Sequence, residues 1–157
     1  MENRIVIDYI DELKKFGIAN KAIEHPALQK VADVVAFLKV GLSDTMPTMV
    51  MVGDGTYYAF VIRGECKLDF KKIKTAIGVK DLRFATYAEF TNLTGLPIGA
   101  ARVYIPNAQT IIDPKVLEKE YLIGGSGRFD CSIQYKTADL PKILGSKIVD
   151  IIKALSQ

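Results

Sequence analysis

The chain has 157 residues, of which 49% are hydrophobic and 25% charged, and its formal net charge is +3. These values are typical of one globular domain with its own core and argue against long disordered segments. No apolar run approaches the roughly 20 residues that a membrane span needs, and the first residues lack the apolar stretch of a signal peptide. Cys66 and Cys131 show no metal-ligand spacing. We therefore expect reduced thiols in a cytoplasmic protein without a membrane partner.

The first forty residues show helical periodicity. Apolar residues recur on one face over 6–16, and Gly17 is expected to end that helix at its C-terminus. A short strand is expected over 21–24. A second amphipathic helix is expected over 28–38, with Gly41 as its stop.

The pattern then changes to β-structure. Two β-rich runs, 48–52 and 56–63, are joined by Gly53-Asp54-Gly55, which is a strong hairpin signal. A helix over 70–77 capped by Asp69, a strand over 82–85, and a helix opened by a capping box at Thr86 and ended by Gly95 are expected next. The remaining expected elements are strands over 102–105 and 110–112, a hairpin of 120–123 with 131–135, and helices over 137–144 and 147–155.

This order of elements predicts the fold class. Two helices come first, helices and strands then mix irregularly, and at least two hairpins are antiparallel. The sequence therefore predicts a single α+β domain over 1–157 with a mixed sheet, rather than a doubly wound fold.

The side chains of common enzyme sites do not gather in this sequence. His25 is the only histidine, and a lone histidine followed by proline is more often structural than catalytic. No serine or cysteine has the context of a nucleophile, and no cluster has metal-ligand spacing, so we expect no metal and no cofactor. The glycine fingerprints of nucleotide-binding loops are also absent. What remains for binding a ligand is backbone.

Two glycine-containing loops offer that backbone. One covers 94–101, and the other is Gly124-Gly125-Ser126-Gly127 after an expected strand. Free N–H groups of such loops can hold an anion or an oxyanion. A tight turn or close packing explains glycine equally well, and spacing alone favours packing for either loop. If the ligand interpretation is right, both loops converge on one pocket.

Several segments stand in a serial order that carries more information than any one of them. They are Ile23-Glu24-His25-Pro26, Met49-Val50-Met51-Val52-Gly53-Asp54-Gly55 with 57–63, Lys67-Leu68-Asp69, Ile77-Gly78, Thr94-Gly95 with Ile98-Gly99, Ile111-Ile112-Asp113, Ile123-Gly124-Gly125-Ser126-Gly127 and Thr137-Ala138-Asp139-Leu140. This order, over roughly residues 20–145, resembles the YbaK/prolyl-tRNA synthetase associated domain family of free-standing editing domains.

The resemblance implies a strongly curved, barrel-like mixed sheet flanked by helices, with N- and C-terminal helices packed on it. It implies hydrolysis, in trans, of the ester between a wrong amino acid and its tRNA. Such a step is needed because a binding pocket discriminates one methylene by only about 1–3 kcal/mol. The implied partners are mischarged aminoacyl-tRNA, bound by its 3′ end, and an aminoacyl-tRNA synthetase. DNA is not among them.

The resemblance also implies a site without a side-chain nucleophile. In the family, glycine-loop backbone positions the aminoacyl carbonyl, and a water or the substrate's own terminal hydroxyl assists the attack. The catalytic backbone implied in this chain is that of Gly95, Gly99 and Gly125. The implied substrate-binding residues are His25, Thr48, Ile98, Ala100, Gly124, Ser126, Gly127 and Asp113.

The sequence departs from the family at two positions. Pro47 stands where the family usually carries a lysine that holds the end of the substrate, and Val103 stands where it often has proline. Proline supplies neither charge nor an N–H group. Arg128, directly after the glycine loop, is the first candidate for the missing charge, with Arg102 as another.

Three functions remain open from the sequence. The first is a trans-editing deacylase. The second is a non-catalytic binder of tRNA or of an aminoacylated ligand on the same fold. The third is a hydrolase or binding domain for another small molecule.

Overall fold

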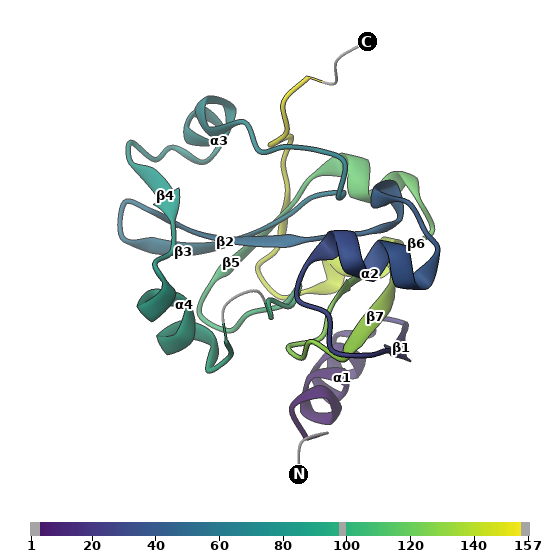
Figure 1. The fold of residues 1–157 in the computed structure, drawn as a ribbon. Coiled ribbons are helices and arrows are strands. Elements are labelled where there is room, and N and C mark those ends of the chain that lie inside the picture. Colours follow the sequence, from purple (N-terminus) through teal and green to yellow (C-terminus); the bar gives the residue numbers. More distant parts are fainter. Residues whose placement is uncertain (1–3, 98–99, 155–157) are drawn as a thin grey trace.

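Two β-sheets form the centre of this α+β fold (Figure 1). The computed structural model describes residues 4–97 and 100–154. The predicted α+β class is confirmed. Within these residues the strands form two sheets, one of five strands and one of three. The two sheets do not close into the barrel-like sheet that the resemblance implied.

The larger sheet is mixed and has the order β4-β2-β3-β5-β8. β2 and β3 form the predicted hairpin, and both central turn residues have positive φ, 47° at Asp54 and 83° at Gly55, as a two-residue type I′ turn requires. β3–β5 and β5–β8 are parallel pairs. The strands are β2 (Thr48–Gly53), β3 (Thr56–Val61), β4 (Leu82–Phe84), β5 (Gln109–Ile112) and β8 (Lys147–Ile148).

The smaller sheet is antiparallel and has the order β1-β7-β6. Its strands are β1 (Asn20–Glu24), β6 (Tyr121–Gly125) and β7 (Cys131–Lys136). Two isolated bridges tie β6 and the residue after it to other segments, Thr45 with Ile123 and Arg102 with Ser126. The first bridge places β6 beside the segment that enters β2, and the second places Ser126 beside the segment at 102.

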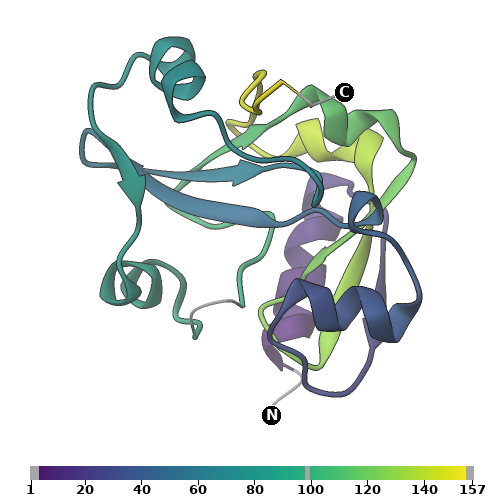
Figure 2. The same ribbon diagram turned by 45° about the horizontal axis from the view of Figure 1, so that its top comes forward.

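The helices flank the two sheets in pairs (Figure 2). α3 and α4 lie on opposite sides of the larger sheet, and α1 and α2 lie beside the smaller one. Their bounds are α1 (Arg4–Phe16), α2 (Val31–Leu38), α3 (Phe70–Ile77) and α4 (Tyr87–Thr94). The described residues also contain the short 3₁₀ helices η1 (Leu42–Asp44), η2 (Pro114–Glu118) and η3 (Thr137–Lys142). No helix in the described ranges is both long and apolar enough to cross a membrane.

Local signals in the sequence set most helix ends. Gly17 follows α1 with φ 81°, and the Asp69 carboxylate accepts a hydrogen bond from the N–H of Lys72 at 3.0 Å. The predicted capping box at Thr86 and Glu89 is present, and Gly95 ends α4 in the left-handed conformation. These caps satisfy backbone groups that a helix end leaves unpaired.

Three buried clusters form the core. One joins Tyr9 and Leu13 of α1 to β6 and β7. A second packs Ile73 of α3 on one face of the larger sheet. The third packs Phe90 of α4 on its other face, together with the segment at 100–105. The third cluster adjoins the candidate site.

The second helix is shorter and more exposed than predicted. It begins at Val31 rather than near 28 and ends at Leu38. The C-cap residue, Lys39, adopts the left-handed conformation with φ 58° and donates its N–H to the Val35 carbonyl. Gly41 instead opens η1. None of the side chains of α2 is fully buried, so this helix covers its neighbours loosely.

The predicted strand over 102–105 is wrong. Arg102 makes a single bridge to Ser126, and the N–H groups of Val103 and Tyr104 donate to the side-chain oxygen of Tyr9. The Tyr9 hydroxyl of α1 thus accepts the hydrogen bonds that the carbonyl groups of a neighbouring strand would otherwise accept.

The predicted C-terminal helix over 147–155 is also wrong in the part that the structure describes. Lys147–Ile148 is strand β8, paired with β5, and none of the following described residues is helical. The N–H of Ile151 donates to the Asp113 carboxylate at 3.0 Å, and the N–H of Lys153 donates to the Lys67 carbonyl at 2.9 Å. These long-range bonds replace the internal bonds of a helix. The predicted helix over 137–144 is a 3₁₀ helix that stops at Lys142 and contains Pro141.

Candidate functional site

A cavity of about 540 Å³ lies among α2, the entrance of β2 and the end of β6. Its wall is mainly apolar and includes Val34, Met46, Val50, Phe90 and Phe129. Phe84 contributes to the wall while 53% exposed, so the cavity opens to solvent there. A site of this size and character suits a small organic group.

Six of the residues named from the sequence line this cavity. They are His25, Thr48, Ala100, Gly124, Gly125 and Arg128. Gly124 and Gly125 lie at the end of strand β6, paired with β7, and not in the loop that the sequence predicted. The end of the first glycine-containing segment, Ala100 and Ala101, meets them at this cavity.

The other named residues lie elsewhere or cannot be placed. Gly95 caps α4 and faces open space. Ser126 is buried, and its hydroxyl donates to the Cys131 carbonyl at 2.6 Å. Gly127 packs against the Arg102 side chain, and the Asp113 carboxylate accepts from the N–H groups of Lys115 and Ile151. Ile98 and Gly99 lie outside the described residues.

Close backbone contact explains why Gly125 is glycine. A Cβ at this position would lie 1.8 Å from the carbonyl oxygen of Ala101. A Cβ at Gly124 would lie 2.9 Å from the Tyr135 ring and 3.2 Å from the carbonyl oxygen of Met46. The bare backbone at 124–125 is therefore required by its neighbours, and it also forms part of the cavity wall.

Two buried tyrosines fix the carbonyl of Gly125. The Tyr135 hydroxyl donates to this carbonyl at 2.7 Å. Because that proton is committed, the Tyr9 hydroxyl donates to Tyr135 Oη, also at 2.7 Å, and Tyr9 Oη accepts from the N–H groups of Val103 and Tyr104. Burial raises the pKa of both phenols, so both remain protonated donors. The chain of bonds connects α1 to the glycine loop.

We expect Tyr135→Phe to lower the free energy of unfolding by about 1–3 kcal/mol, because it leaves the Gly125 carbonyl and the Tyr9 hydroxyl without their partner. Urea unfolding followed by circular dichroism measures this change. Tyr121→Phe is the matched control, since Tyr121 lies on neighbouring β6 and is exposed. Equal midpoints for the two variants would contradict the assigned role of Tyr135.

Arg128 lies at the cavity and forms an ion pair with Asp130. The second candidate for positive charge, Arg102, stacks its guanidinium on the Tyr9 ring, with Cζ 4.7 Å from the ring centroid, and is absent from the cavity wall. Burial lowers the pKa of Arg102. Pro47 is part of the wall, and its carbonyl accepts from the N–H of Ile62 at 3.3 Å.

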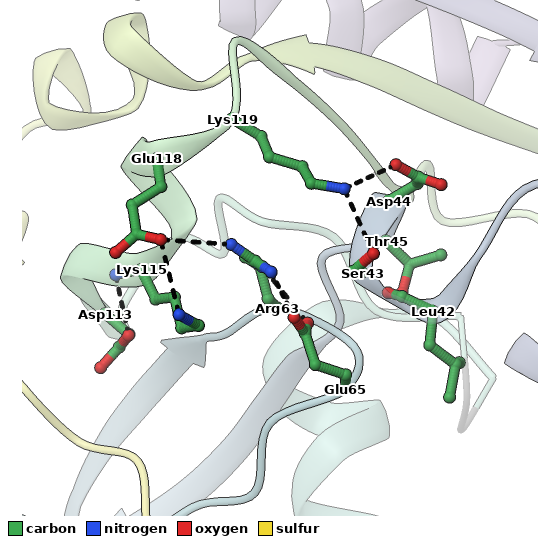
Figure 3. Close-up of polar contacts among 10 residues, drawn as sticks. All are labelled: Leu42, Ser43, Asp44, Thr45, Arg63, Glu65, Asp113, Lys115, Glu118 and Lys119. Atoms are coloured by element: carbon green, nitrogen blue, oxygen red, sulfur yellow. Dashed lines mark hydrogen bonds and ion pairs between the residues drawn. The ribbon is translucent and has the colours of Figure 1, made fainter. Parts of the chain in front are cut away.

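Two groups of paired side chains lie near the segment that leads into Pro47, and the one around Lys119 contacts it (Figure 3). Lys119 binds Asp44 at 2.8 Å and the Ser43 hydroxyl at 3.2 Å, which ties the end of η2 to η1. Arg63 pairs with Glu65 and with Glu118, the latter at 3.5 Å.

Hydrogen bonds and close packing also hold the segment that leads into Pro47. The Thr45 hydroxyl donates to the Leu42 carbonyl at 2.7 Å, and a Cβ at Gly64 would lie 2.0 Å from Thr45 Oγ1. The N–H of Met46 donates to the Ile123 carbonyl at 2.7 Å. The wall formed by Thr45, Met46 and Pro47 is therefore preformed.

Cys131 lines the cavity but is not suited to attack an ester. Burial raises the pKa of its thiol, and only the thiolate is an effective nucleophile. Among the described residues there is also no group of three or more His, Cys, Asp or Glu side chains placed to hold a metal ion.

Comparison with known sequences identifies the domain. The aminoacyl-tRNA editing domain family matches residues 25–143. The chain belongs to the aminoacyl-tRNA editing domain family. The matched residues include the cavity-lining segments at 25, 45–50, 100–101 and 123–132.

Curated relatives of this editing domain are proline--tRNA ligases. The ligase of Geobacter sulfurreducens is 30% identical over 115 residues, which are 73% of this chain and 20% of the ligase. The ligase of Solidesulfovibrio magneticus is 38% identical over 84 residues, which are 53% of this chain and 15% of the ligase. The chain thus spans a fifth or less of the length of these relatives.

Two solved structures share nearly the whole fold of this editing domain. The hypothetical protein APE2540 gives a TM-score of 0.84 at 26% identity and covers 92% of this chain and 99% of its own. A candidate trans-editing enzyme for prolyl tRNA synthetase gives 0.81 at 20% identity and covers 95% and 98%. At 20% identity the second similarity shows the fold alone.

Sequence reasoning missed Ser132 in this cavity. Its hydroxyl lies 2.8 Å from His25 Nε2, and both residues line the wall. The two are 107 positions apart, and their meeting depends on the pairing of β1 with β7. No spacing rule within the sequence signals that contact.

Proposed function

We propose that this editing domain is a trans-editing deacylase that hydrolyses mischarged aminoacyl-tRNA. The observation that carries the proposal is the cavity of about 540 Å³ in which the bare backbone of Gly124 and Gly125 adjoins an apolar wall. Such a wall accepts the side chain of an amino acid, and the main chain of Gly124 and Gly125 is the part of the wall against which we place the ester. Membership of the editing-domain family supports the same reaction.

The proposed reaction needs no side-chain nucleophile. Water, assisted by the free hydroxyl of the terminal ribose, attacks the ester carbonyl. The bond between that carbonyl carbon and the ribose oxygen breaks, and the departing ribose oxygen takes up the proton that the water gives up. The protein holds the carbonyl against preformed main chain, where fixed dipoles stabilise the developing negative charge better than mobile water does. The raised pKa of the Cys131 thiol fits this mechanism, since it argues against a thiolate attack.

The 3′ end of tRNA is single-stranded, and single-stranded bases stack on exposed aromatic rings. Phe84 offers such a ring at the rim of the cavity. We place the terminal adenosine at this rim, with the amino acid directed toward Phe90. A synthetase that delivers the tRNA belongs to the same proposal, because the matched relatives carry the corresponding region within proline--tRNA ligases.

One observation favours a second function, a binder of aminoacyl-tRNA without catalysis. Pro47 occupies the wall where relatives are expected to carry lysine, and among the described wall residues Arg128 is the one arginine and no lysine is present. Arg128 is itself ion-paired with Asp130. Weak stabilisation of charge would slow hydrolysis and leave binding.

Deacylation of a panel of mischarged tRNAs tests both functions. We expect the wild type to release amino acid from at least one member, and Arg128→Ala to lower kcat/KM by roughly tenfold to a hundredfold through loss of a charge-assisted contact. Arg83→Ala is the matched control, because Arg83 is exposed, paired with Glu89 and outside the cavity wall. Arg63 would not serve as a control, since it is buried and ion-paired with Glu65 and Glu118, so its loss would disturb the fold.

Pro47→Lys separates the two functions. If the wild type binds aminoacyl-tRNA without releasing amino acid, and Pro47→Lys releases it, the binder interpretation is correct. If neither protein binds or hydrolyses any tRNA of the panel, both functions are wrong.

A further inference from the structure

Ser132 and His25 form a polar pair in the wall of the cavity. Ser132 Oγ lies 2.8 Å from His25 Nε2, and His25 Nδ1 lies 2.7 Å from the carbonyl oxygen of Pro26. The backbone of the histidine is held as well, because its N–H donates to the Asp130 carbonyl at 3.0 Å. Both residues are more than nine-tenths buried.

The partners of the ring determine which way each hydrogen bond runs. A carbonyl oxygen can only accept, so Nδ1 carries the proton that bonds to Pro26. In the neutral ring Nε2 is then an acceptor, and the Ser132 hydroxyl must donate to it. The hydroxyl proton is committed to the ring, and Ser132 Oγ therefore presents only lone pairs to the cavity.

The same pair could be read as a serine nucleophile with its base. A nucleophilic serine of that kind relies on a carboxylate behind the histidine, which stabilises the imidazolium that forms during attack. Here the group behind the ring is the neutral Pro26 carbonyl, and no Asp or Glu occurs among the described residues of the cavity wall. The arrangement favours binding over nucleophilic attack.

We propose that Ser132 Oγ accepts a hydrogen bond from a donor on the aminoacyl end of the bound substrate, and that His25 sets the polarity of this acceptor. The inference rests on the proposed function. A fixed acceptor selects N–H or O–H groups and rejects carbonyl and phosphate oxygens. The aminoacyl end offers two such donors, the α-amino group and the free ribose hydroxyl beside the ester.

The experiment removes one donor at a time. Three substrates are compared, namely the aminoacyl-tRNA that the wild type hydrolyses fastest, its counterpart with hydrogen in place of the α-amino group, and its counterpart with a 2′-deoxy terminal adenosine. The value of kcat/KM is measured for each with the wild type, Ser132→Ala and Ser132→Thr. Differences in intrinsic ester reactivity cancel, because every variant hydrolyses the same three esters.

The preference for a donor is the ratio of kcat/KM for the complete substrate to kcat/KM for the substrate that lacks that donor. Ser132→Ala should reduce one of the two wild-type preferences by about three- to tenfold and leave the other unchanged. The preference that falls identifies the donor. Ser132→Thr retains the hydroxyl and should retain the preference, which a merely structural role would not predict. Ser146→Ala is the control, since that hydroxyl donates to the Pro141 carbonyl outside the cavity wall. Unchanged preferences in Ser132→Ala would overturn the proposal.

Binding separates failure of this inference from failure of the proposed function. If the wild type releases no amino acid, the same substrates are prepared with a stable amide link, and their Kd values are measured for the wild type and both Ser132 variants. A three- to tenfold loss of preference in Ser132→Ala supports the acceptor role without any hydrolysis. Normal hydrolysis with equal preferences in all variants refutes the acceptor role and leaves the deacylase intact.

Discussion

Gly125→Ala is expected to lower the free energy of unfolding by about 3 kcal/mol and to abolish deacylation. The added Cβ would lie 1.8 Å from the carbonyl oxygen of Ala101, and the neighbouring backbones have little freedom to separate. The bridge between Arg102 and Ser126 holds one side, and the bond from Tyr135 to the Gly125 carbonyl holds the other. Any relief of the clash must widen the cavity wall where the ester is proposed to lie.

Guanidinium unfolding and deacylation by the same preparation measure these two effects. Gly41→Ala is the control, because Gly41 has φ −93° and an added Cβ would meet nothing closer than 3.5 Å. That variant should lose at most about 1 kcal/mol, the scale of replacing glycine by alanine at an N-cap, because Gly41 is the N-cap of η1. A Gly125→Ala protein with the wild-type midpoint would show that the two loops do not approach as closely as 1.8 Å implies.

Features that depend on neighbouring residues could be predicted from the sequence. The turn at Asp54-Gly55, the cap at Asp69 and the capping box at Thr86 each follow from residues within a few positions of one another. Short-range chemistry of this kind decides where helices and hairpins begin and end, because it acts whatever the rest of the chain does.

Features that depend on distant partners could not be predicted. Ile148, Ile151 and Ile152 recur at helical spacing, yet β5 and the Asp113 carboxylate hold this segment extended. Its apolar side chains still reach the core, since Ile151 and Ile152 join the cluster around α3. The periodicity identified Ile151 and Ile152 correctly as buried, but Ile148 is 47% exposed. The backbone conformation was wrong because tertiary hydrogen bonds outweigh a weak helical preference.

The candidate site shows the same division. Gly124 and Gly125 could be singled out because a run of glycine is unusual in any chain. Glycine is required at these two positions because Ala101 and Tyr135 lie too close for a side chain. No local sequence pattern signals that approach. Ser132 carries no local signal either, since its significance arises only where β7 brings it to His25.

Leu13→Ala is expected to lower the free energy of unfolding by about 2–5 kcal/mol, the usual cost of deleting a fully buried leucine side chain. Leu13 is 0% exposed and packs in the cluster that joins α1 to β6 and β7. The same cluster contains Tyr9 and Tyr135, which hold the glycine loop. A cavity at Leu13 should therefore also loosen the Gly125 carbonyl and slow deacylation at temperatures well below unfolding.

Two further variants set the scale for Leu13→Ala. Leu38→Ala should cost clearly less, because Leu38 is only partly buried on a helix that has no fully buried side chain. Lys15→Ala should cost within about 0.5 kcal/mol, since Lys15 is exposed on the same helix as Leu13. Urea midpoints in the order Leu13→Ala, Leu38→Ala, Lys15→Ala, from lowest to highest, are expected. If Leu38→Ala were as destabilising as Leu13→Ala, α2 would have to pack far more tightly than its exposure indicates, and the cavity beneath it would be smaller than 540 Å³ in solution.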